Sequence, residues 1–330
     1  MNKKLEGHFA MFVSKSFSGL NANALKFLVP VWMTPLAGVT FRVLFGAVAF
    51  WVVDLFLRKK RESPDKLAGD SAPAVENRKL GMKEIVPLLL IGMFGFYVFQ
   101  IAYLTAVQYT TPVSVSILGS LMPVWTFVIG MVIYKTEHFA WNKIVGLTIS
   151  VGGAVLSVFA KKPHEMAANP VLGDSLAILS SIAYAFYLLY SKKLLERVDS
   201  ITMLKWSFTG AAFAAVVVDS VLTWGPFHTA SLLHAPVLDS TIHWVPLLVL
   251  LFVLLFPTVL SFFLLQIGLK YLPATVVASY NNVLIVVATI TSLILGQDVF
   301  SWLQTGAIAL LFVGLYFISK PEPSAIEPMR

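Results

Sequence analysis

Residues 109–158 of the chain read YTTPVSVSILGSLMPVWTFVIGMVIYKTEHFAWNKIVGLTISVGGAVLSV. Two long apolar runs flank a short polar segment at residues 135–138. The first run has about 22 residues, and about 20 helical apolar residues are enough to cross the ~30 Å hydrocarbon core of a bilayer. The stretch therefore predicts a hairpin of two membrane-spanning helices.

A second stretch near the C-terminus repeats this pattern. Residues 271–319 read YLPATVVASYNNVLIVVATITSLILGQDVFSWLQTGAIALLFVGLYFIS. A shift of 161 positions aligns Pro112 with Pro273, Glu137 with Asp298, Phe139 with Phe300, Trp141 with Trp302 and Gly153 with Gly314. A repeat of this length predicts that the chain consists of two related halves.

The composition indicates a membrane protein. Hydrophobic residues make up 58% of the chain and charged residues 12%, whereas soluble domains average about 45–50% and 25%. The apolar runs are continuous, and they are longer than the alternating segments of an outer-membrane barrel, so helices are expected. The chain contains no Cys, which excludes disulfides, thiol catalysis and thiolate metal sites.

The apolar runs predict an all-α, polytopic membrane protein with ten transmembrane helices. The expected spans are residues 9–27, 34–57, 84–107, 112–134, 141–160, 174–195, 201–222, 244–269, 273–295 and 301–319. The first span follows two lysines as a signal peptide does, but Lys15 interrupts it and no small-residue cleavage site is present, so a mature helix is expected. Pro123 and Pro257 predict kinks in the fourth and eighth spans.

The span count predicts two inverted five-helix repeats. Because five is odd, the second repeat starts on the opposite side of the membrane from the first. The expected units are a first repeat at residues 1–163 with a cytoplasmic linker loop at 58–83, a second repeat at 170–320, and a tail at 321–330. Inverted repeats favour a transporter that works by alternating access around a site near the membrane midplane, with a channel as the alternative.

Basic residues predict the orientation. With both termini in the cytoplasm, the inner segments hold 19 of the 24 Lys and Arg residues, and the outer segments hold only Lys161 and Lys162. This imbalance agrees with the positive-inside rule and accounts for the net charge of +7. A nucleic-acid or lipid-binding patch at residues 58–83 is the disfavoured alternative, because the segment reads as a polar linker with basic ends.

Several of these segments resemble a known family. The segments are KSFSGLNANALK at residues 15–26, TFRVL at 40–44, AVQYTTPVSVSILGSLMP at 106–123, residues 137–146, and the second copy at 268–314. Together they resemble the EamA-type branch of the drug/metabolite transporter superfamily over nearly the whole chain. The resemblance implies a ten-helix bundle that exports or exchanges small metabolites, amino acids or drugs at the bacterial inner membrane. Two positions depart from it: Ser18 stands where Trp commonly precedes a Gly, and Leu284 is the second-repeat counterpart of Pro123.

Polar residues at mid-membrane depth predict the site, because an unsatisfied polar group in hydrocarbon costs several kcal/mol. We expect a midplane substrate site lined by Asn21, Tyr97, Ser120, Tyr184, Tyr187 and Asn281. Close helix packing is the alternative role for Ser120, and interhelix packing is the alternative for the two tyrosines on the 184–187 face.

Lys15 and Arg42 are the strongest single indications of function, and both are included in the predicted substrate site. A cation within the hydrocarbon costs at least ~2.5 kcal/mol on insertion scales, so it usually faces a cavity or a partner. No Asp or Glu lies at the same depth in any predicted span. A substrate carboxylate or phosphate, a water or a backbone carbonyl is left as the partner.

The sequence thus predicts a multi-pass transporter of the bacterial inner membrane that exports or exchanges amino-acid-like or organic-anion solutes, without an evident proton relay. A channel, an uptake permease or, least favoured, a membrane-embedded enzyme are the alternatives. No nucleophile with a base, no paired carboxylates and no metal ligands occur at membrane depth, so no catalytic residue, metal or cofactor is expected. The expected partners are a small-molecule substrate and the lipid bilayer, not nucleic acid, in a monomer or homodimer.

Overall fold

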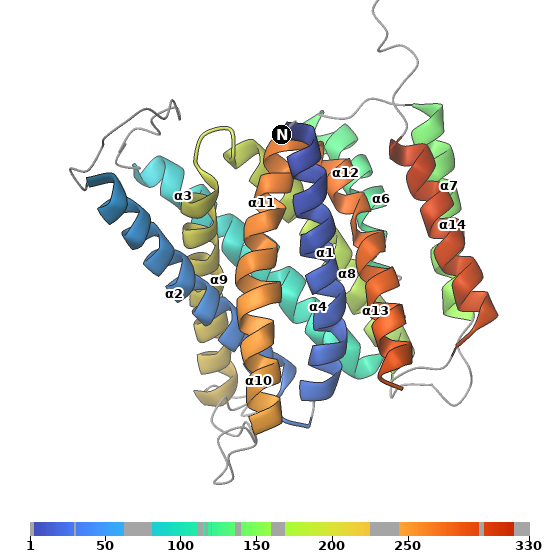
Figure 1. Cartoon of the computed structure of the whole chain (residues 1–330), viewed down its shortest axis with the longest axis horizontal. Coiled ribbons are helices and arrows are strands. Elements are labelled where there is room, and N and C mark those ends of the chain that lie inside the picture. Colours follow the sequence, from blue (N-terminus) through green and yellow to red (C-terminus); the bar gives the residue numbers. More distant parts are fainter. Residues whose placement is uncertain are drawn as a thin grey trace, which may run out of the picture.

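The computed structural model describes residues 3–29, 31–62, 81–110, 115, 118–119, 121–135, 140–159, 169–224, 244–296 and 300–319. Within these ranges the chain is helical and contains no strand. The helices, with π-helical segments labelled η, are α1 (Lys3–Leu28), α2 (Pro35–Glu62), α3 (Met82–Leu90), η1 (Ile91–Tyr97), α4 (Val98–Tyr109), α6 (Met122–Ile129), η2 (Gly130–Tyr134), α7 (Trp141–Phe159), α8 (Pro170–Leu194), α9 (Ser200–Trp224), α10 (Trp244–Val253), η6 (Leu254–Leu260), α11 (Ser261–Tyr271), α12 (Ala274–Ser279), α13 (Asn281–Ile294) and α14 (Trp302–Ser319). Figure 1 shows them as a bundle in which most helices run roughly parallel or antiparallel to one another.

Some predicted features lie outside the described residues. They are most of the linker loop, Ser120, residues 136–138 of the polar segment at 135–138, Lys161 and Lys162, the loop at 225–243 that the predicted topology places outside the cell, and the tail at 321–330.

Long apolar helices confirm an all-helical, multi-pass membrane protein. In the described part of the chain, six helical segments are long and apolar enough to cross a membrane: Pro35–Arg58, Met82–Tyr109, Pro170–Leu194, Ser200–Val221, Trp244–Tyr271 and Ala274–Ile294. Met122–Tyr134 and Thr305–Ile318 are shorter apolar helices. α1 is less apolar because it carries Lys15, Asn21 and Lys26.

Two predicted spans are interrupted, which corrects the expectation of continuous helices at 112–134 and 273–295. A turn at Tyr280 separates α12 from α13, and a turn at Leu121 precedes α6. Backbone bonds three residues apart replace the regular helical bonds around both turns, and such bonds tighten the chain locally. The length of an apolar run does not reveal this change, although a polar residue, Ser120 or Asn281, directly adjoins each turn.

The two prolines predicted to kink the fourth and eighth spans lie in different surroundings. Pro257 lies inside η6, where the helix widens by one residue per turn, and such π-helical segments accommodate a missing backbone donor. Pro123 lies in the first turn of α6, where a helix needs no donor from it. Pro123 therefore follows a break in its span and does not bend a continuous helix.

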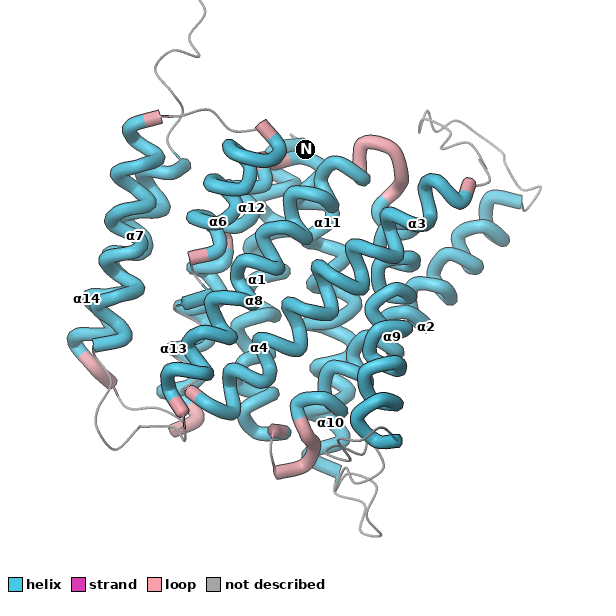
Figure 2. Tube along the Cα trace, turned by 180° about the vertical axis from the view of Figure 1, so that it is seen from behind, coloured by secondary structure: helices cyan, strands magenta, loops and turns pink. Residues whose placement is uncertain are grey.

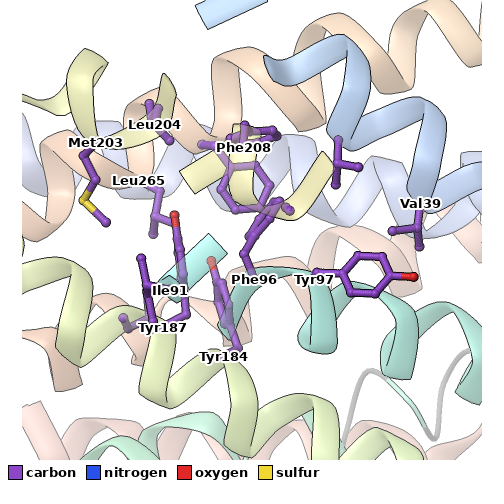
Figure 3. Packing of buried hydrophobic residues seen from close by; sticks show 14 of the residues in the cluster. Val39, Ile91, Phe96, Tyr97, Tyr184, Tyr187, Met203, Leu204, Phe208 and Leu265 are labelled. Atoms are coloured by element: carbon purple, nitrogen blue, oxygen red, sulfur yellow. The ribbon is translucent and has the colours of Figure 1, made fainter. Parts of the chain in front are cut away.

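Aromatic side chains fill the centre of the bundle, as Figure 3 shows. The ring of Phe96 lies 4.7 Å from those of Phe208 and Phe262, measured between centroids. Large apolar side chains also cover the outside, and Phe9 and Trp302 are 65% and 82% exposed. An apolar exterior of this kind suits contact with lipid chains.

Corresponding helices of the two predicted repeats pack against each other. α2 lies against α9, and α7 lies beside α14 at one edge of the bundle (Figures 1 and 2). The backbones of α7 and α14 lie so close together that a Cβ atom on Gly146 would lie 2.5 Å from the carbonyl oxygen of Gly314. Small residues allow helix backbones to approach in this way in membranes.

Candidate functional site

An internal cavity of about 80 Å³ lies within the bundle, enough for several water molecules or a small solute. Five of the eight predicted site residues line it: Lys15, Asn21, Arg42, Tyr184 and Asn281. They come from α1, α2, α8 and α13, so both halves of the chain contribute to the same cavity.

Lys15 is held at the cavity wall by α13. The side chain is only 4% exposed, and its Nζ atom donates a hydrogen bond to Oδ1 of Asn281 at 3.3 Å. The Nδ2 atom of Asn281 in turn donates to the carbonyl oxygen of Gly119 at 3.1 Å. The ammonium also lies 5.1 Å from the centre of the Tyr184 ring, which is within the range of a cation–π attraction. The turn before α13 therefore places Asn281 between a cation and a backbone carbonyl of the other half.

Arg42 is equally buried, at 5% exposure. Its Nη1 atom donates to Oε1 of Gln100 at 2.9 Å, and its Nε atom donates to Oγ1 of Thr258 at 3.0 Å. The Thr258 hydroxyl donates to the carbonyl oxygen of Val253 at 2.8 Å. That carbonyl would bond to residue 257 in a regular helix, but Pro257 has no N–H group. Pro257 thus leaves the Val253 carbonyl free to accept from the Thr258 hydroxyl, and this bond holds the hydroxyl where it accepts a hydrogen bond from Arg42.

The described wall of the cavity carries two cations and no acid. Its described lining contains no Asp, Glu or His, and the hydrogen-bond partners of Lys15 and Arg42 are neutral amides and a hydroxyl. Two further lining atoms have no partner, the donor Nε2 of Gln100 and the acceptor Oδ1 of Asn21. The unpaired donor next to the guanidinium suits an anionic group, because carboxylates and phosphates accept several charge-assisted hydrogen bonds at once.

Two of the predicted residues do not line the cavity. Tyr187 accepts a hydrogen bond from Nε2 of Gln266 at 3.1 Å and packs against Phe96. Figure 3 shows Tyr97 beside Val39, away from Tyr184. Ser120 lies outside the described residues, although its neighbour Gly119 lines the cavity.

Other lining residues were not predicted. Phe99, Tyr103 and Phe262 supply aromatic walls, and the rings of Phe99 and Tyr184 stack at 4.3 Å. Gln100 carries a visible signal, since it is an amide in the middle of an apolar run. The aromatic residues carry none, because Phe and Tyr are as common on the lipid face and in the core as at a site.

Comparison with known proteins agrees with this architecture. The family model described as EamA-like transporter family matches residues 5–159 and 171–320. The uncharacterized transporter YetK of Bacillus subtilis (strain 168) is 25% identical over 250 residues, which cover 74% of this chain and 72% of YetK. The uncharacterized transporter YyaM of the same bacterium is 19% identical over 296 residues, or 89% of this chain and 88% of YyaM.

A solved structure has the same fold. That crystal structure matches with a TM-score of 0.63 and 16% sequence identity over 96% of each chain. The family match falls on two successive segments that together take in most of the described helices. The chain is therefore a membrane transporter that belongs to the EamA-like transporter family.

Proposed function

We propose that this transporter exports or exchanges small metabolites that carry a carboxylate or phosphate, including amino-acid-like solutes, by alternating access. One observation carries the proposal: Lys15 and Arg42 are both buried, both line the central cavity, and both have only neutral hydrogen-bond partners there. A buried cation in a membrane is stabilised by a countercharge. Since the described lining supplies none, a bound anion would provide it.

The neutral groups of the cavity fit the rest of such a solute. Oδ1 of Asn21 is a buried acceptor without a partner, so it suits a hydroxyl, amide or ammonium donor. The rings of Phe99, Tyr103 and Tyr184 offer apolar surface beside it. An amino-acid-like zwitterion and a simple organic anion therefore both fit, with the anionic group near Arg42 in either case.

The topology is part of the proposal. Ten transmembrane helices would form two inverted five-helix repeats at residues 1–163 and 170–320, with both termini in the cytoplasm and the protein in a bacterial inner membrane. The packing of α2 against α9 and of α7 against α14 supports this arrangement, since corresponding helices meet at the axis of an inverted repeat. Two such halves can exchange conformations and open the cavity to each side in turn.

The cavity also supports transport without proton coupling. Proton-coupled carriers commonly titrate an intramembrane Asp, Glu or His, and none of these residues lies in the described lining. Arg42 stays protonated throughout. Facilitated diffusion or solute exchange follows as the energetic mode.

The test is solute flux in proteoliposomes that contain the full chain. A panel of amino acids, hydroxy acids and phosphorylated small metabolites is loaded inside, and efflux is measured with and without external solute. Acceleration by external solute identifies an exchanging carrier, whereas a channel shows no such effect. Arg42→Gln is expected to reduce anion flux at least tenfold, and the exposed cation Lys270 provides the control Lys270→Gln. Unchanged anion flux in Arg42→Gln would refute the anion assignment.

A further inference from the structure

A second cavity lies on the outside of the bundle, between α3–η1, α8 and η2. It has a volume of about 530 Å³ and shares no lining residue with the central cavity. Its walls are apolar and include Pro87, Phe94, Leu179 and Phe186. Figure 2, seen from behind, shows α3 and α4 as one long tilted helix on this side of the molecule. We refer to this cavity as the lateral groove.

The lateral groove opens towards the lipid and not towards the bundle interior. Phe94 is 67% exposed and Leu179 46% exposed. Tyr184 lines the central cavity, whereas its direct neighbour Ala183 on α8 lines the groove, so α8 separates the two spaces. In a membrane, an open apolar groove of this kind is filled by hydrocarbon chains, because water molecules in it would find no hydrogen-bond partners on its walls.

One end of the lateral groove is polar. Tyr134, at the end of η2, and Tyr190, near the end of α8, both line it. Tyr side chains favour the level of lipid headgroups, where the ring is in hydrocarbon and the hydroxyl meets water. This end therefore lies near a membrane surface, and under the proposed topology that surface is the cytoplasmic one.

Three lysines surround the same end. Lys83 precedes Pro87 by one helical turn, Lys135 follows Tyr134 directly, and Lys193 follows Tyr190 by one turn. Residues one turn apart share a helix face, so Lys83 and Lys193 extend the groove walls of α3 and α8, and Lys135 caps the end of η2 beside Tyr134. All three are exposed, and within the described ranges none of them forms an ion pair.

We propose that the lateral groove binds an anionic phospholipid, with an acyl chain along Phe94, Leu179 and Phe186 and the phosphate between the three lysines. Basic groups at the mouth of a pocket between transmembrane helices are suited to anionic headgroups, and long lysine side chains reach the headgroup level. A neutral lipid would fill the apolar part equally well but would leave the three ammonium groups without a counterion. The three lysines therefore favour an anionic headgroup, and the apolar groove favours a ligand with an acyl chain.

The experiment compares lipids on the purified full chain. Thermal unfolding in a neutral detergent is followed with added phosphatidylglycerol, phosphatidylcholine or soluble glycerol phosphate, and native mass spectrometry measures retained lipid. Phosphatidylglycerol is expected to raise the unfolding temperature and to be retained, because a ligand that binds only the folded state stabilises it. Phosphatidylcholine, which lacks the net charge, is expected to do neither, and glycerol phosphate, which lacks the chain, is expected not to displace retained phosphatidylglycerol.

Matched variants locate the site. Lys135→Gln with Lys193→Gln is expected to weaken phosphatidylglycerol binding by about twenty-fivefold, since each lysine near a membrane surface contributes roughly a factor of five. Lys3→Gln with Lys270→Gln removes two exposed charges away from the groove and is expected to leave binding unchanged. Ala183→Phe fills the groove from α8 and is expected to abolish retention. If Ala183→Phe does not fold, Leu179→Trp replaces it: this substitution is at an exposed position of the groove and is likewise expected to block lipid retention.

Three results would overturn the proposal. Equal retention of phosphatidylcholine and phosphatidylglycerol removes the role of charge, and an equal loss in the control pair shows general attraction to anionic lipid. Displacement of retained phosphatidylglycerol by glycerol phosphate removes the role of the chain. These outcomes do not depend on solute flux, so the lipid site and the proposed transport function stand or fall separately.

Discussion

The Nζ atom of Lys205 on α9 lies 2.7 Å from Oδ2 of Asp54 on α2, and this ion pair links two helices inside the bundle. Lys205 is only 2% exposed, and its ammonium also lies 4.5 Å from the centre of the Trp51 ring. Arg58, one turn after Asp54, contributes a second cation at 3.1 Å from the same oxygen atom. Asp54 therefore neutralises a lysine that would otherwise be buried without a countercharge.

We predict that Asp54→Asn lowers the free energy of unfolding by about 3–5 kcal/mol, since breaking a buried pair leaves one charge uncompensated. Lys205→Met is expected to cost less, because Arg58 still pairs with the remaining carboxylate. The double variant should be more stable than Asp54→Asn alone. Chemical unfolding in detergent measures all three, and strictly additive losses would contradict the pairing.

The two buried tyrosines of α8 are expected to respond differently to substitution. Tyr184→Leu removes a wall of the central cavity and the ring beside Lys15, so flux and the order of preferred solutes should change. Tyr187→Phe removes only the hydrogen bond from Gln266, which is worth about 1 kcal/mol, and should leave the solute preference as it is. Flux in proteoliposomes and unfolding in detergent separate the two effects. A changed preference in Tyr187→Phe would show that the site extends beyond the cavity.

These tyrosines also show what the sequence could predict about the site. A polar group deep in an apolar run is costly, so depth alone was sufficient to select Arg42, Lys15 and Asn281. Depth does not tell which way a side chain points around its helix. Residues three apart on a helix point about 60° apart, and this difference turns Tyr184 into the cavity and Tyr187 against Phe96.

Contacts between distant helices could not be predicted from the sequence either, because they depend on how the helices cross. The pairing of Lys205 with Asp54 depends on how α2 and α9 cross, and neither apolar run contains that information. The break at Tyr280 is likewise set by tertiary contacts: Asn281 bonds with Lys15 and with Gly119 and so fixes the start of α13. The length and number of apolar runs, in contrast, are local properties, and they predicted the helical membrane fold.

The close contact between α7 and α14 should be sensitive to one methyl group. In Gly146→Ala the new Cβ atom would meet the backbone of α14 at 2.5–2.8 Å, so the helices must separate, at a cost of about 1–3 kcal/mol for overpacking. Gly152 on the same helix has open space around its Cβ position, and Gly152→Ala is expected to be neutral or stabilising by the helix propensity of Ala. Thermal unfolding in detergent compares them. Equal stability of the two variants would argue against the contact.

The orientation of the chain can be tested by cysteine labelling, because the sequence has no native Cys. Ser231, which lies outside the described residues, falls in the loop expected outside the cell. Ser231→Cys should react with a membrane-impermeant maleimide in intact cells, and Ser324→Cys in the C-terminal tail should react only after the membrane is opened. Labelling of position 231 solely from the cytoplasmic side would reverse the proposed topology.

Energy coupling is the last prediction, and it depends on the charges at the central cavity. Lys15 and Arg42 line it together with neutral side chains, and no carboxylate or imidazole is present in its described lining. A proton gradient then has no carboxylate or imidazole in the described lining through which to act, so imposing a pH gradient across proteoliposomes should not produce uphill accumulation. Preloaded solute should instead exchange with external solute until the concentrations on the two sides of the membrane are equal.

Asn281→Asp provides a gain-of-function control, because it places a carboxylate within hydrogen-bond reach of Lys15. That variant should weaken anion flux by neutralising the cation, and its flux should depend on pH more strongly than that of the native chain. Accumulation driven by the pH gradient in the native chain would show that a titrating group elsewhere is coupled to transport.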